Sequence, residues 1–442
     1  MSEKQIFLVA GKPVLHSLNP YIFNTVFQTL NIDACYTRLT AACAGEALKT
    51  GREMKLHGMN VTSPLKEGMA DLADSLDDHA EKIKAVNTIV FQNNKAVGYN
   101  TDCKGAIQAL KSNSINPRGR NIIILGAGGA ARAAAYGMKI SKAKKITIAN
   151  RDIKKAQSLA ELLGCEYTSF QRVNDLLEES DILISCIPQS ISMFADTLLR
   201  KNLILLDANY KYDHFCSSQK TGQRDIRFIS GLDWLFFQAM PAFQIFTGLQ
   251  VPIDFQEKLH RNLKSREMPS KPHIALIGFM GSGKTTVGQL LADELGYDFI
   301  DTDLAIEQLS GQTILEIFKR SGERVFREME TSLIEQILGD SKASVISLGG
   351  GAVMDEENLT IIRQRCLVIW LWISARGALS RIDYRTRPLL KSSDPTKNAE
   401  SLLFIRKPFY ARASDLVIDS EIGTAHDIVR RIKYEMDQAF RN

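Results

Sequence analysis

A glycine-rich segment, Gly278 to Thr285, has the strongest chemical signature in this chain; it reads Gly-Phe-Met-Gly-Ser-Gly-Lys-Thr. This G-x-x-x-x-G-K-T spacing is typical of a loop whose backbone N–H groups surround a phosphate group. Lys284 is placed to reach the outer phosphates of a nucleotide, and the Thr285 hydroxyl to ligate Mg²⁺. We predict that the nucleotide contacts a continuous run of residues: Gly281, Ser282, Gly283, Lys284, Thr285 and Thr286.

The elements around this loop support the phosphate-binding interpretation. A strand-like apolar run, residues 273–277, precedes it, and an amphipathic stretch, residues 286–295, follows it. A helix that starts directly after the loop directs its positive end at the same anion. A chance match in an irregular loop would lack this strand and helix, so the sequence predicts a nucleotide-binding domain here.

A second glycine-rich turn predicts a dinucleotide site. Residues 121–125 read as a buried strand, residues 132–140 as a helix and residues 145–149 as another strand, which together form a βαβ unit. Alanine replaces the third glycine of the usual fingerprint, which the fold tolerates. The turn between the first strand and the helix supplies the predicted cofactor contacts: Gly126, Ala127, Gly128, Gly129 and Ala130.

The end of the second strand favours NADP(H) over NAD(H). NAD sites usually carry an acidic residue there, which bonds to the ribose hydroxyl. This chain has Asn150 and Arg151 instead. An arginine can pair with the 2′-phosphate of NADP, which a carboxylate would repel. The alternative is an exposed loop arginine without a ligand.

Lys66 and Asp102 are candidates for proton transfer. They lie in polar, turn-like stretches, residues 60–66 and 98–102, that adjoin apolar runs. Reduction of a ketone by hydride leaves an alkoxide that needs a proton, and a lysine held by a carboxylate can donate one. Taken alone, Lys66 is more typical of a surface lysine near a helix start than of a catalytic lysine, and Asp102 is more typical of a helix N-cap.

Downstream of the phosphate loop, an apolar strand is expected to end in Asp301-Thr302-Asp303. Because side chains alternate along a strand, both carboxylates should point to one side. One carboxylate, Asp301, is then placed to assist Mg²⁺, and Asp303 to bond to a hydroxyl or accept its proton. Helix capping is the alternative role for either residue.

Further along, Arg327 and Glu330 are three residues apart and should share one helix face. They form either a surface ion pair or an arginine oriented by Glu330 toward a substrate carboxylate. A strand at residues 345–348 leads into three glycines, Gly349, Gly350 and Gly351, which favours close approach of the backbone to a ligand. The basic segment 385–390 is typical of a lid over a transferring phosphate.

Length and composition set the frame for these sites. A chain of 442 residues needs two or three cores. The polar linker at residues 265–272 carries two prolines, which predicts a boundary and independent domains on either side. The net charge of +5 comes without a dense Lys/Arg tract, so nucleic acid is not expected. Seven scattered cysteines, no membrane-spanning run and no leader pattern predict a soluble protein of the cytoplasm.

Taken together, the motifs of residues 1 to about 265 resemble shikimate dehydrogenase. The resemblance implies that Lys66 and Asp102 are the catalytic pair, and that Gly231 belongs to a segment running to Gln238 near the cofactor. It also implies a set of residues that bind the substrate: Ser17, Asn19, Thr62, Asn87, Tyr210 and Gln238.

The chain departs from this family's pattern at four places. Asn19 stands where a second serine is usual, Phe23 where histidine is usual, and Tyr212 where proline is usual. Asn19 can still hydrogen-bond to a hydroxyl or carboxylate, so the reaction type should be unchanged. Asp152 replaces the usual threonine after Arg151, and its charge is expected to weaken binding of the 2′-phosphate.

Residues 273–442 resemble shikimate kinase. The resemblance implies that Lys284 and Thr285 serve ATP and Mg²⁺, with Asp301 assisting the metal, and that Arg387 of the lid stabilises the transferring phosphoryl group. Arg381 matches the arginine that stacks on adenine. The implied shikimate-binding set is Asp303, Arg327, Gly349, Gly350, Gly351 and Arg406, with Asp303 also catalytic.

The sequence therefore predicts an α/β protein of three domains and a linker. They are a substrate domain (residues 1–103 with 230–265), a Rossmann NADP domain (104–229), the linker (266–272) and a phosphate-loop kinase domain (273–442). The predicted function is reduction of 3-dehydroshikimate with NADPH, then phosphorylation of shikimate with MgATP, by a monomer or homodimer.

Two alternatives stay open at this stage. The first is an NAD-dependent quinate/shikimate dehydrogenase fused to a kinase, which the charge of Asp152 keeps possible. The second is a shikimate-sensing regulator with decayed sites, although the charged residues expected at both sites are present. Neither alternative involves nucleic acid or a membrane.

Overall fold

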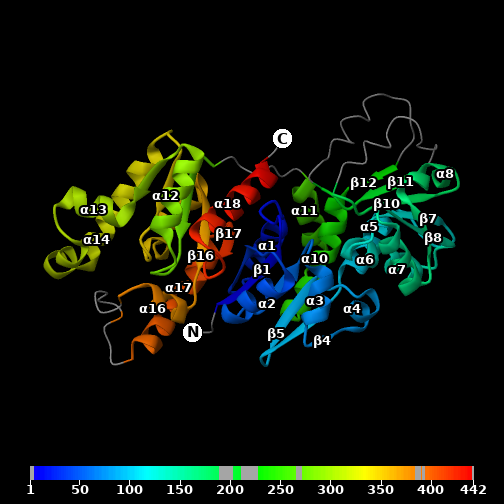
Figure 1. Cartoon of the computed structure of the whole chain (residues 1–442), viewed down its shortest axis with the longest axis horizontal. Coiled ribbons are helices and arrows are strands. Elements are labelled where there is room, and N and C mark those ends of the chain that lie inside the picture. Colours follow the sequence, from blue (N-terminus) through cyan, green and yellow to red (C-terminus); the bar gives the residue numbers. More distant parts are fainter. Residues whose placement is uncertain are drawn as a thin grey trace.

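The computed structural model describes residues 4–188, 203–210, 227–264, 271–383, 390 and 394–440. Strands and helices alternate along most of this chain, which confirms the predicted α/β class. Three bodies follow one another along the long axis (Figure 1). The segment from β13 onward lies at one end, the first strands of the chain in the middle, and the strands from β7 to β12 at the other end.

The middle body contains six strands and is covered by helices from two separate parts of the chain. Its strands are β1 (Gln5–Gly11), β2 (Ala34–Thr40), β3 (Gly58–Val61), β4 (Ser75–Leu76), β5 (Thr88–Gln92) and β6 (Lys95–Tyr99). Its helices are α1 (Asn19–Thr29), α2 (Ala44–Glu53), α3 (Lys66–Leu72), α4 (Asp78–Ile83), α10 (Gly231–Thr247) and α11 (Ile253–Lys264).

The second body is built on a parallel sheet of order β12-β11-β10-β7-β8-β9. Its strands are β7 (Asn121–Leu125), β8 (Lys145–Asn150), β9 (Glu166–Ser169), β10 (Ile182–Ser185), β11 (Ile204–Asp207) and β12 (Arg227–Ile229). Its helical segments are α5 (Asp102–Ser112), α6 (Gly129–Ile140), α7 (Ile153–Leu163), η1 (Phe170–Arg172) and α8 (Val173–Leu177). The βαβ unit predicted at residues 121–149 is present as β7, α6 and β8.

The third body starts at the phosphate-loop strand. Its strands are β13 (His273–Ile277), β14 (Asp298–Asp301), β15 (Ser344–Ser347), β16 (Cys366–Trp372) and β17 (Leu416–Asp419). Its first helical segments are α12 (Lys284–Leu295), α13 (Thr302–Ser310), α14 (Ile314–Gly339), η4 (Ala352–Met354) and α15 (Glu356–Arg365). The last three are α16 (Ala375–Arg381), α17 (Pro395–Ala413) and α18 (Ala425–Phe440).

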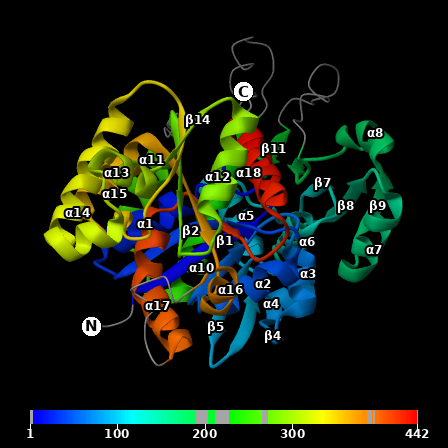
Figure 2. The ribbon, with the colours of Figure 1, turned by 60° about the vertical axis from the view of Figure 1, so that its left-hand side comes forward.

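The strands of the middle body and of the third body form one continuous sheet of eleven strands. Its order is β14-β15-β13-β16-β17-β2-β1-β3-β5-β6-β4, and the two parts join where β17 pairs with β2 at Val417 and Leu39. Figure 2 shows β1 and β2 beside the helices of the third body. The prediction that the two halves are independent domains is therefore wrong at this junction, although residues 265–270 of the linker lie outside the described part.

The continuous sheet places both sets of predicted site residues along one edge. From β14 to β3 all neighbouring strands are parallel, so their carboxyl ends lie at the same edge. The phosphate loop follows β13, and the segments that carry Ser17 and Lys66 follow β1 and β3. Sites of open parallel sheets lie at this edge because the connecting loops gather there.

Asp233 in the first turn of α10 ties three helices together. Its carboxylate is 2.7 Å from both His260 Nε2 and Lys264 Nζ on α11, and it accepts a 3.0 Å hydrogen bond from Asn113 after α5. Burial alone would raise its pKa, but these three partners lower the pKa of Asp233 from 3.8 to about 2. The charged form of Asp233 is therefore favoured by folding.

We expect Asp233→Asn to lower the free energy of unfolding at pH 7 by about 2 kcal/mol. An acid whose folded pKa is depressed stabilises above its unfolded pKa, and this stabilisation is lost as pH falls through the folded value. The difference between variant and parent should thus shrink by about half at pH 3. Urea unfolding at both pH values measures it; a difference that does not change with pH would contradict this origin.

None of the helices in the described part of the chain combines the length and the apolar character needed to cross a bilayer.

Candidate active sites

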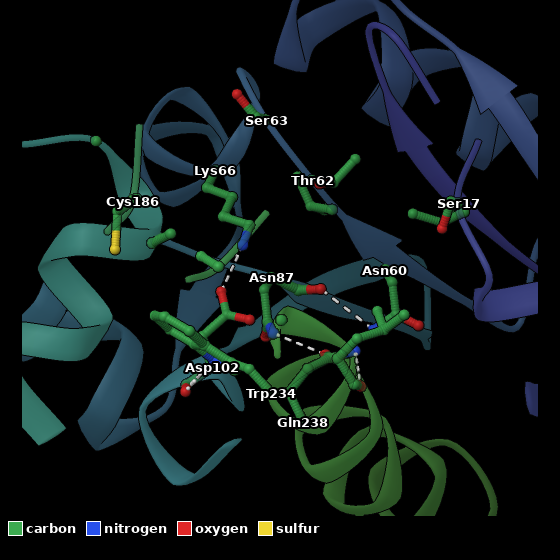
Figure 3. Close-up of a pocket in the computed structure, with 18 of the residues that line it drawn as sticks. Ser17, Asn60, Thr62, Ser63, Lys66, Asn87, Asp102, Cys186, Trp234 and Gln238 are labelled. Carbon is green, nitrogen blue, oxygen red and sulfur yellow. Dashed lines mark hydrogen bonds and ion pairs between the residues drawn. The ribbon is translucent and has the colours of Figure 1, made fainter. Parts of the chain in front are cut away.

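A cavity of about 370 Å³ opens between the carboxyl edge of β1 and β3 and the glycine-rich turn after β7 (Figure 3). Helices α3, α5 and α10 and the segments that follow β10 and β11 also line it. The structure brings together here every residue of the first half predicted to bind substrate or transfer a proton: Ser17, Asn19, Thr62, Lys66, Asn87, Asp102, Tyr210 and Gln238. Their individual roles remain predictions.

Lys66 and Asp102 form a largely buried ion pair in this cavity. The Lys66 Nζ lies 2.5 Å from Asp102 Oδ2, and the two side chains are 14% and 8% exposed. Lys66 begins α3 and Asp102 begins α5, while Thr101 is the N-cap residue of α5. Asp102 is therefore not the helix cap considered as its alternative role, and its carboxylate is available to orient the ammonium group.

Amide and hydroxyl side chains form a hydrogen-bonded floor beside this pair (Figure 3). Asn87 Nδ2 donates to Thr101 Oγ1 at 2.8 Å and to Gln238 Oε1 at 3.2 Å, while Asn87 Oδ1 accepts from the Thr101 N–H. Asn60 Nδ2 donates to the backbone carbonyl of Asn87. Such a fixed set of donors and acceptors suits a ligand with several hydroxyl groups.

Ser17 and Tyr210 both line this cavity. The two side chains are hydrogen-bonded, and burial raises the pKa of the Tyr210 phenol, which stays neutral. Asn19, which departs from the family pattern, is buried at the start of α1 and lines the same cavity. Tyr212, the other departure in this region, lies outside the described residues.

Sequence reasoning did not single out Trp234 or Cys186, which also line the cavity. The Trp234 Nε1–H donates to the backbone carbonyl of Asp102 at 2.9 Å and so fixes the start of α5. Burial raises the pKa of the Cys186 thiol, which keeps it neutral. A tryptophan in an apolar helix gives no signal of such a role, because core packing explains it equally well.

The turn after β7 fits a dinucleotide. Gly126 has φ of +107°, a backbone conformation that favours glycine. A Cβ at Gly129 would lie 2.7 Å from Lys66 Cβ, so glycine allows the turn to approach the ion pair closely. Gly128 is the N-cap of α6, whose free N–H groups face the turn and suit a pyrophosphate. Ala130 and Gly231 also line the cavity.

Arg151 follows β8 at the position predicted to select the cofactor. Its guanidinium lies over the Phe170 ring, 5.8 Å from the centroid. The Asp152 carboxylate accepts from the N–H groups of Lys154 and Lys155 and caps α7. Asp152 thus has a structural role that explains its presence. Its negative charge is partly balanced by the positive N-terminal end of α7.

The phosphate loop has the geometry that its spacing predicts. Gly278, Gly281 and Gly283 have φ values of +146°, +77° and +87°. A Cβ at Gly278 would lie 2.5 Å from a backbone oxygen of β16, so this position excludes a larger residue. Lys284 Nζ donates to the Gly278 carbonyl at 3.0 Å, which holds the ammonium over the loop. These features fit the phosphates of ATP.

Asp301 both caps a helix and contacts the loop. Its Oδ1 accepts from the N–H groups of Asp303 and Leu304, and its Oδ2 accepts from Thr285 Oγ1 at 2.8 Å. A hydroxyl and a carboxylate in contact are oxygen donors of the kind Mg²⁺ prefers when phosphates and water complete its shell. Thr285 and Asp301 therefore fit the metal that was predicted for them.

The predicted geometry of Asp303 is wrong in one respect. The strand ends at Asp301 and α13 begins at Thr302, so Asp303 lies in a helical first turn. The cap formed by Asp301 starts the helix there, and strand alternation cannot explain the placement of Asp303. The side chain still reaches the triple-glycine segment, because a Cβ on Gly349 would lie 2.8 Å from Asp303 Oδ1.

Arg327 and Glu330 share a face of α14, as their spacing predicts. Arg327 Nη1 lies 2.6 Å from Glu330 Oε2, and the Glu330 side chain is 0% exposed. Burial raises the pKa of Glu330, and Arg327 opposes that rise. Burial disfavours the charge of Arg327, but Glu330 and Glu323 hold its pKa above the usual value. A buried Glu330 orients the guanidinium, which a solvated surface pair would not do.

The triple glycine brings this arginine and a second one together. A Cβ on Gly351 would lie 2.5 Å from Arg327 Nη2, and a Cβ on Gly350 would lie 3.0 Å from Arg406 Nη1. The Gly350 carbonyl accepts from the Tyr410 hydroxyl at 2.6 Å. Two arginines beside a half-buried glycine backbone without side chains suit an anionic ligand with hydroxyl groups.

Arg381 lies against the phosphate loop, as expected of a nucleotide contact. Its guanidinium donates to the Gly281 carbonyl at 3.4 Å and to the Ser420 carbonyl at 2.7 Å. The predicted lid residue Arg387 lies outside the described part of the chain.

Comparison with known proteins accounts for both regions. Residues 9–89 match the model "Shikimate dehydrogenase substrate binding domain" and residues 108–203 match "Shikimate / quinate 5-dehydrogenase". The chain is 33% identical over 276 residues to the shikimate dehydrogenase (NADP(+)) of Alkaliphilus oremlandii, covering 96% of that protein and 58% of this chain. The chain belongs to the shikimate dehydrogenase family.

Residues 280–437 match the model "Shikimate kinase", so the shikimate dehydrogenase region is followed by a shikimate kinase domain.

Two further relatives agree with this family. The shikimate dehydrogenase (NADP(+)) of Methanothrix thermoacetophila is 35% identical over 262 residues, which are 95% of that protein and 57% of this chain. The crystal structure of shikimate dehydrogenase from Aquifex aeolicus shares 30% identity and a TM-score of 0.54, and the match covers 99% of that chain and 59% of this one. The matches to these shikimate dehydrogenases cover 57% and 59% of this chain, and the shikimate kinase match covers residues 280–437.

Proposed function

We propose that this protein is a bifunctional enzyme. Its first half reduces 3-dehydroshikimate to shikimate with NADPH, and its last domain phosphorylates shikimate at the O3 hydroxyl with MgATP. The observation that carries this proposal is the Lys66–Asp102 ion pair in a polar cavity next to the dinucleotide turn, in a chain that also holds a complete phosphate loop. The product of the first reaction is then the substrate of the second.

In the reduction, bound NADPH supplies hydride to the carbonyl carbon. The Lys66 ammonium donates a proton to the oxygen as that oxygen gains charge, and Asp102 holds the ammonium in place. Asn87 and Gln238 hold the ring hydroxyls, and the wall formed by Ser17, Asn19, Thr62 and Tyr210 receives the carboxylate side of the substrate. Fixed hydrogen-bond partners restrict the substrate to one orientation.

In the phosphorylation, bound MgATP supplies the transferred phosphoryl group. Asp303 bonds to the attacking hydroxyl and accepts its proton, while Arg327 and Arg406 bind the shikimate carboxylate beside Gly349, Gly350 and Gly351. Lys284 balances charge on the outer phosphates, and Thr285 with Asp301 holds the metal. Catalysis here consists of placement and charge balance, because the protein forms no covalent bond to the substrate.

A coupled assay with the purified chain tests the whole proposal. Supplied with 3-dehydroshikimate, NADPH and MgATP, the protein should oxidise one NADPH and consume one ATP for each shikimate 3-phosphate formed. A faster rate with NADH would favour the quinate/shikimate alternative. Absence of turnover at both steps in folded protein would instead favour the regulator with decayed sites.

Cofactor preference gives a prediction at Arg151. We expect Arg151→Ala to raise KM for NADP⁺ roughly tenfold, because a charge-assisted bond to the 2′-phosphate is lost, and to leave KM for NAD⁺ unchanged. Asp152→Thr should act in the opposite direction, since threonine keeps a helix cap but removes the negative charge. Initial rates with both cofactors measure these effects; equal changes for NADP⁺ and NAD⁺ would contradict the assignment.

We place the enzyme in the cytoplasm, as a monomer or homodimer. The six cysteines in the described residues are free thiols, which fits a reducing compartment.

A further inference from the structure

The carboxylate of Glu435 lies fully buried at the junction between the kinase domain and the first half of the chain. It belongs to α18, the last helix, and is 0% exposed. Its Oε2 accepts from the N–H groups of Val14 and Leu15 at 2.7 and 2.9 Å, and its Oε1 accepts from Thr40 Oγ1 at 2.7 Å. All three donors come from the first half of the chain, about as far away in sequence as the chain allows.

The segment held by Glu435 leads directly into the dehydrogenase cavity. Val14 and Leu15 are buried, and the Ser17 N–H donates to the Val14 carbonyl at 2.9 Å, so residues 14–17 form a tight turn. This turn, which we call the Ser17 turn, sets where the Ser17 hydroxyl lies in the cavity. A shift of the Val14 and Leu15 backbone would therefore move a residue of the substrate wall.

The side chain of Arg38, on β2, also links the kinase domain to the Ser17 turn. Its Nε and Nη2 donate to the Ser17 carbonyl at 3.0 and 2.7 Å, and its Nη1 donates to the Asp415 carbonyl at 3.0 Å. Asp415 directly precedes β17, the kinase strand that pairs with β2. Arg38 thus connects the kinase strand to the far end of the Ser17 turn.

Other contacts of the junction hold the two halves together without reaching this turn. Thr37 Oγ1 donates to the Ser414 carbonyl at 3.0 Å, and Thr50 Oγ1 donates to Asp419 Oδ2 at 2.7 Å. These contacts and the shared sheet also dock the kinase domain. A buried carboxylate at the Ser17 turn is costly unless all its partners are in place, so its geometry and that of the turn depend on each other.

We propose that Glu435 is a positioning residue of the dehydrogenase, supplied by the kinase domain. With Arg38, it fixes the Ser17 turn so that shikimate binding in the first site depends on the correct docking of the last helix. The proposal rests on the proposed function of the first half. It implies that the kinase domain completes the dehydrogenase substrate site and is not a passive attachment to it.

The test compares Glu435→Gln with the parent in the full chain, by oxidation of shikimate with NADP⁺. Glutamine keeps the shape but removes the negative charge that strengthens the bonds from the Val14 and Leu15 N–H groups, and its N–H₂ group must donate to Thr40 Oγ1 instead of accepting from it. KM for shikimate should rise roughly tenfold, as expected for loss of a charge-assisted bond. KM for NADP⁺ and the kinase rates should stay within twofold of the parent values.

Thr37→Val is the matched control, since it removes a buried hydrogen bond across the same junction but does not contact the Ser17 turn. It should lower the melting temperature without changing KM for shikimate. If Glu435→Gln leaves this KM unchanged, or if Thr37→Val raises it equally, the positioning role is refuted. Glu257→Gln, on the exposed face of α11, controls for the loss of one carboxylate.

Arg38→Lys gives an independent test should Glu435→Gln fold poorly. Lysine keeps the charge but cannot bridge the Ser17 and Asp415 carbonyls, so KM for shikimate should again rise while KM for NADP⁺ does not. An unchanged KM in this variant would also count against the proposal. Activity of the parent is a separate matter: if the parent does not oxidise shikimate, the proposed function fails, whatever the role of Glu435.

Discussion

Lys66→Ala is expected to lower kcat for dehydroshikimate reduction by about 100- to 10,000-fold, the range found when a general acid is removed. Lys66 Nζ lies 2.5 Å from Asp102 Oδ2 in the substrate cavity, so the variant loses the proton donor and leaves Asp102 unpaired. KM for NADPH should change little, because the backbone of the glycine-rich turn and the start of α6, and not the Lys66 ammonium, are proposed to hold the pyrophosphate. Stopped-flow or steady-state measurement of the rate of NADPH oxidation gives this change in kcat.

Two further variants separate proton transfer from charge. Lys66→Arg keeps a cation beside Asp102, but a guanidinium does not release its proton, so kcat should remain low. Lys104→Ala removes an exposed lysine of α5, the helix that Asp102 begins, and should leave kcat unchanged. If Lys66→Arg kept full activity, the lysine would act as a charge and not as an acid.

Kinase activity with added shikimate should survive Lys66→Ala. The substituted side chain lies at the start of α3, which follows β3, and the kinase residues follow β13, β14 and β15 of the same sheet. Lys66 makes none of the junction contacts described for Thr37, Glu435 or Arg38. A loss of both activities in folded protein would mean that the two sites are coupled more tightly than the proposed role of Glu435 requires.

The sequence predicted the local elements around both sites because their signals are local. Glycines with positive φ at Gly126, Gly278 and Gly283 are needed wherever a backbone turn surrounds a phosphate. The strands at residues 121–125 and 273–277 occur as predicted, since short apolar runs bounded by turns leave few other structures. Spacing of three residues likewise predicted the contact between Arg327 and Glu330.

The junction between the halves could not be predicted in this way. Strand β17 reads Leu-Val-Ile-Asp, a buried strand that could pair with many others, and nothing in its sequence specifies β2 as its neighbour. Pairing between distant strands is decided by the packing of both surfaces and not by either segment alone. The proline-containing linker therefore suggested independent domains, although the continuous sheet shows otherwise.

Glu435 was missed for a related reason. It lies in an amphipathic helix with many charged residues, where a glutamate is ordinarily solvated. It is buried because Val14, Leu15 and Thr40 supply donors from a distant part of the chain. Asp303 shows the local counterpart: the cap formed by Asp301 ended a strand two residues earlier than alternation of side chains suggested.

Lys284→Ala is expected to lower kcat for shikimate phosphorylation by about 100- to 1,000-fold, the effect of removing one fixed group that stabilises transition-state charge. The ammonium donates to the Gly278 carbonyl, and the Lys284 side chain is half-buried. Its removal therefore costs a loop hydrogen bond but leaves no large cavity, so the domain should stay folded. Lys397→Ala, at an exposed position of α17, is the control for loss of a lysine. ATP consumption with added shikimate gives the rate, and dehydrogenase kcat should equal that of the parent.

The two lysine variants together test whether the sites work in sequence. Lys284→Ala protein should accumulate shikimate from 3-dehydroshikimate and NADPH, and Lys66→Ala protein should phosphorylate it. An equimolar mixture should therefore restore formation of shikimate 3-phosphate after a lag, because shikimate made by one molecule diffuses to another. A mixture that accumulates shikimate without phosphorylating it would show that the kinase site accepts substrate only from the dehydrogenase site of its own chain.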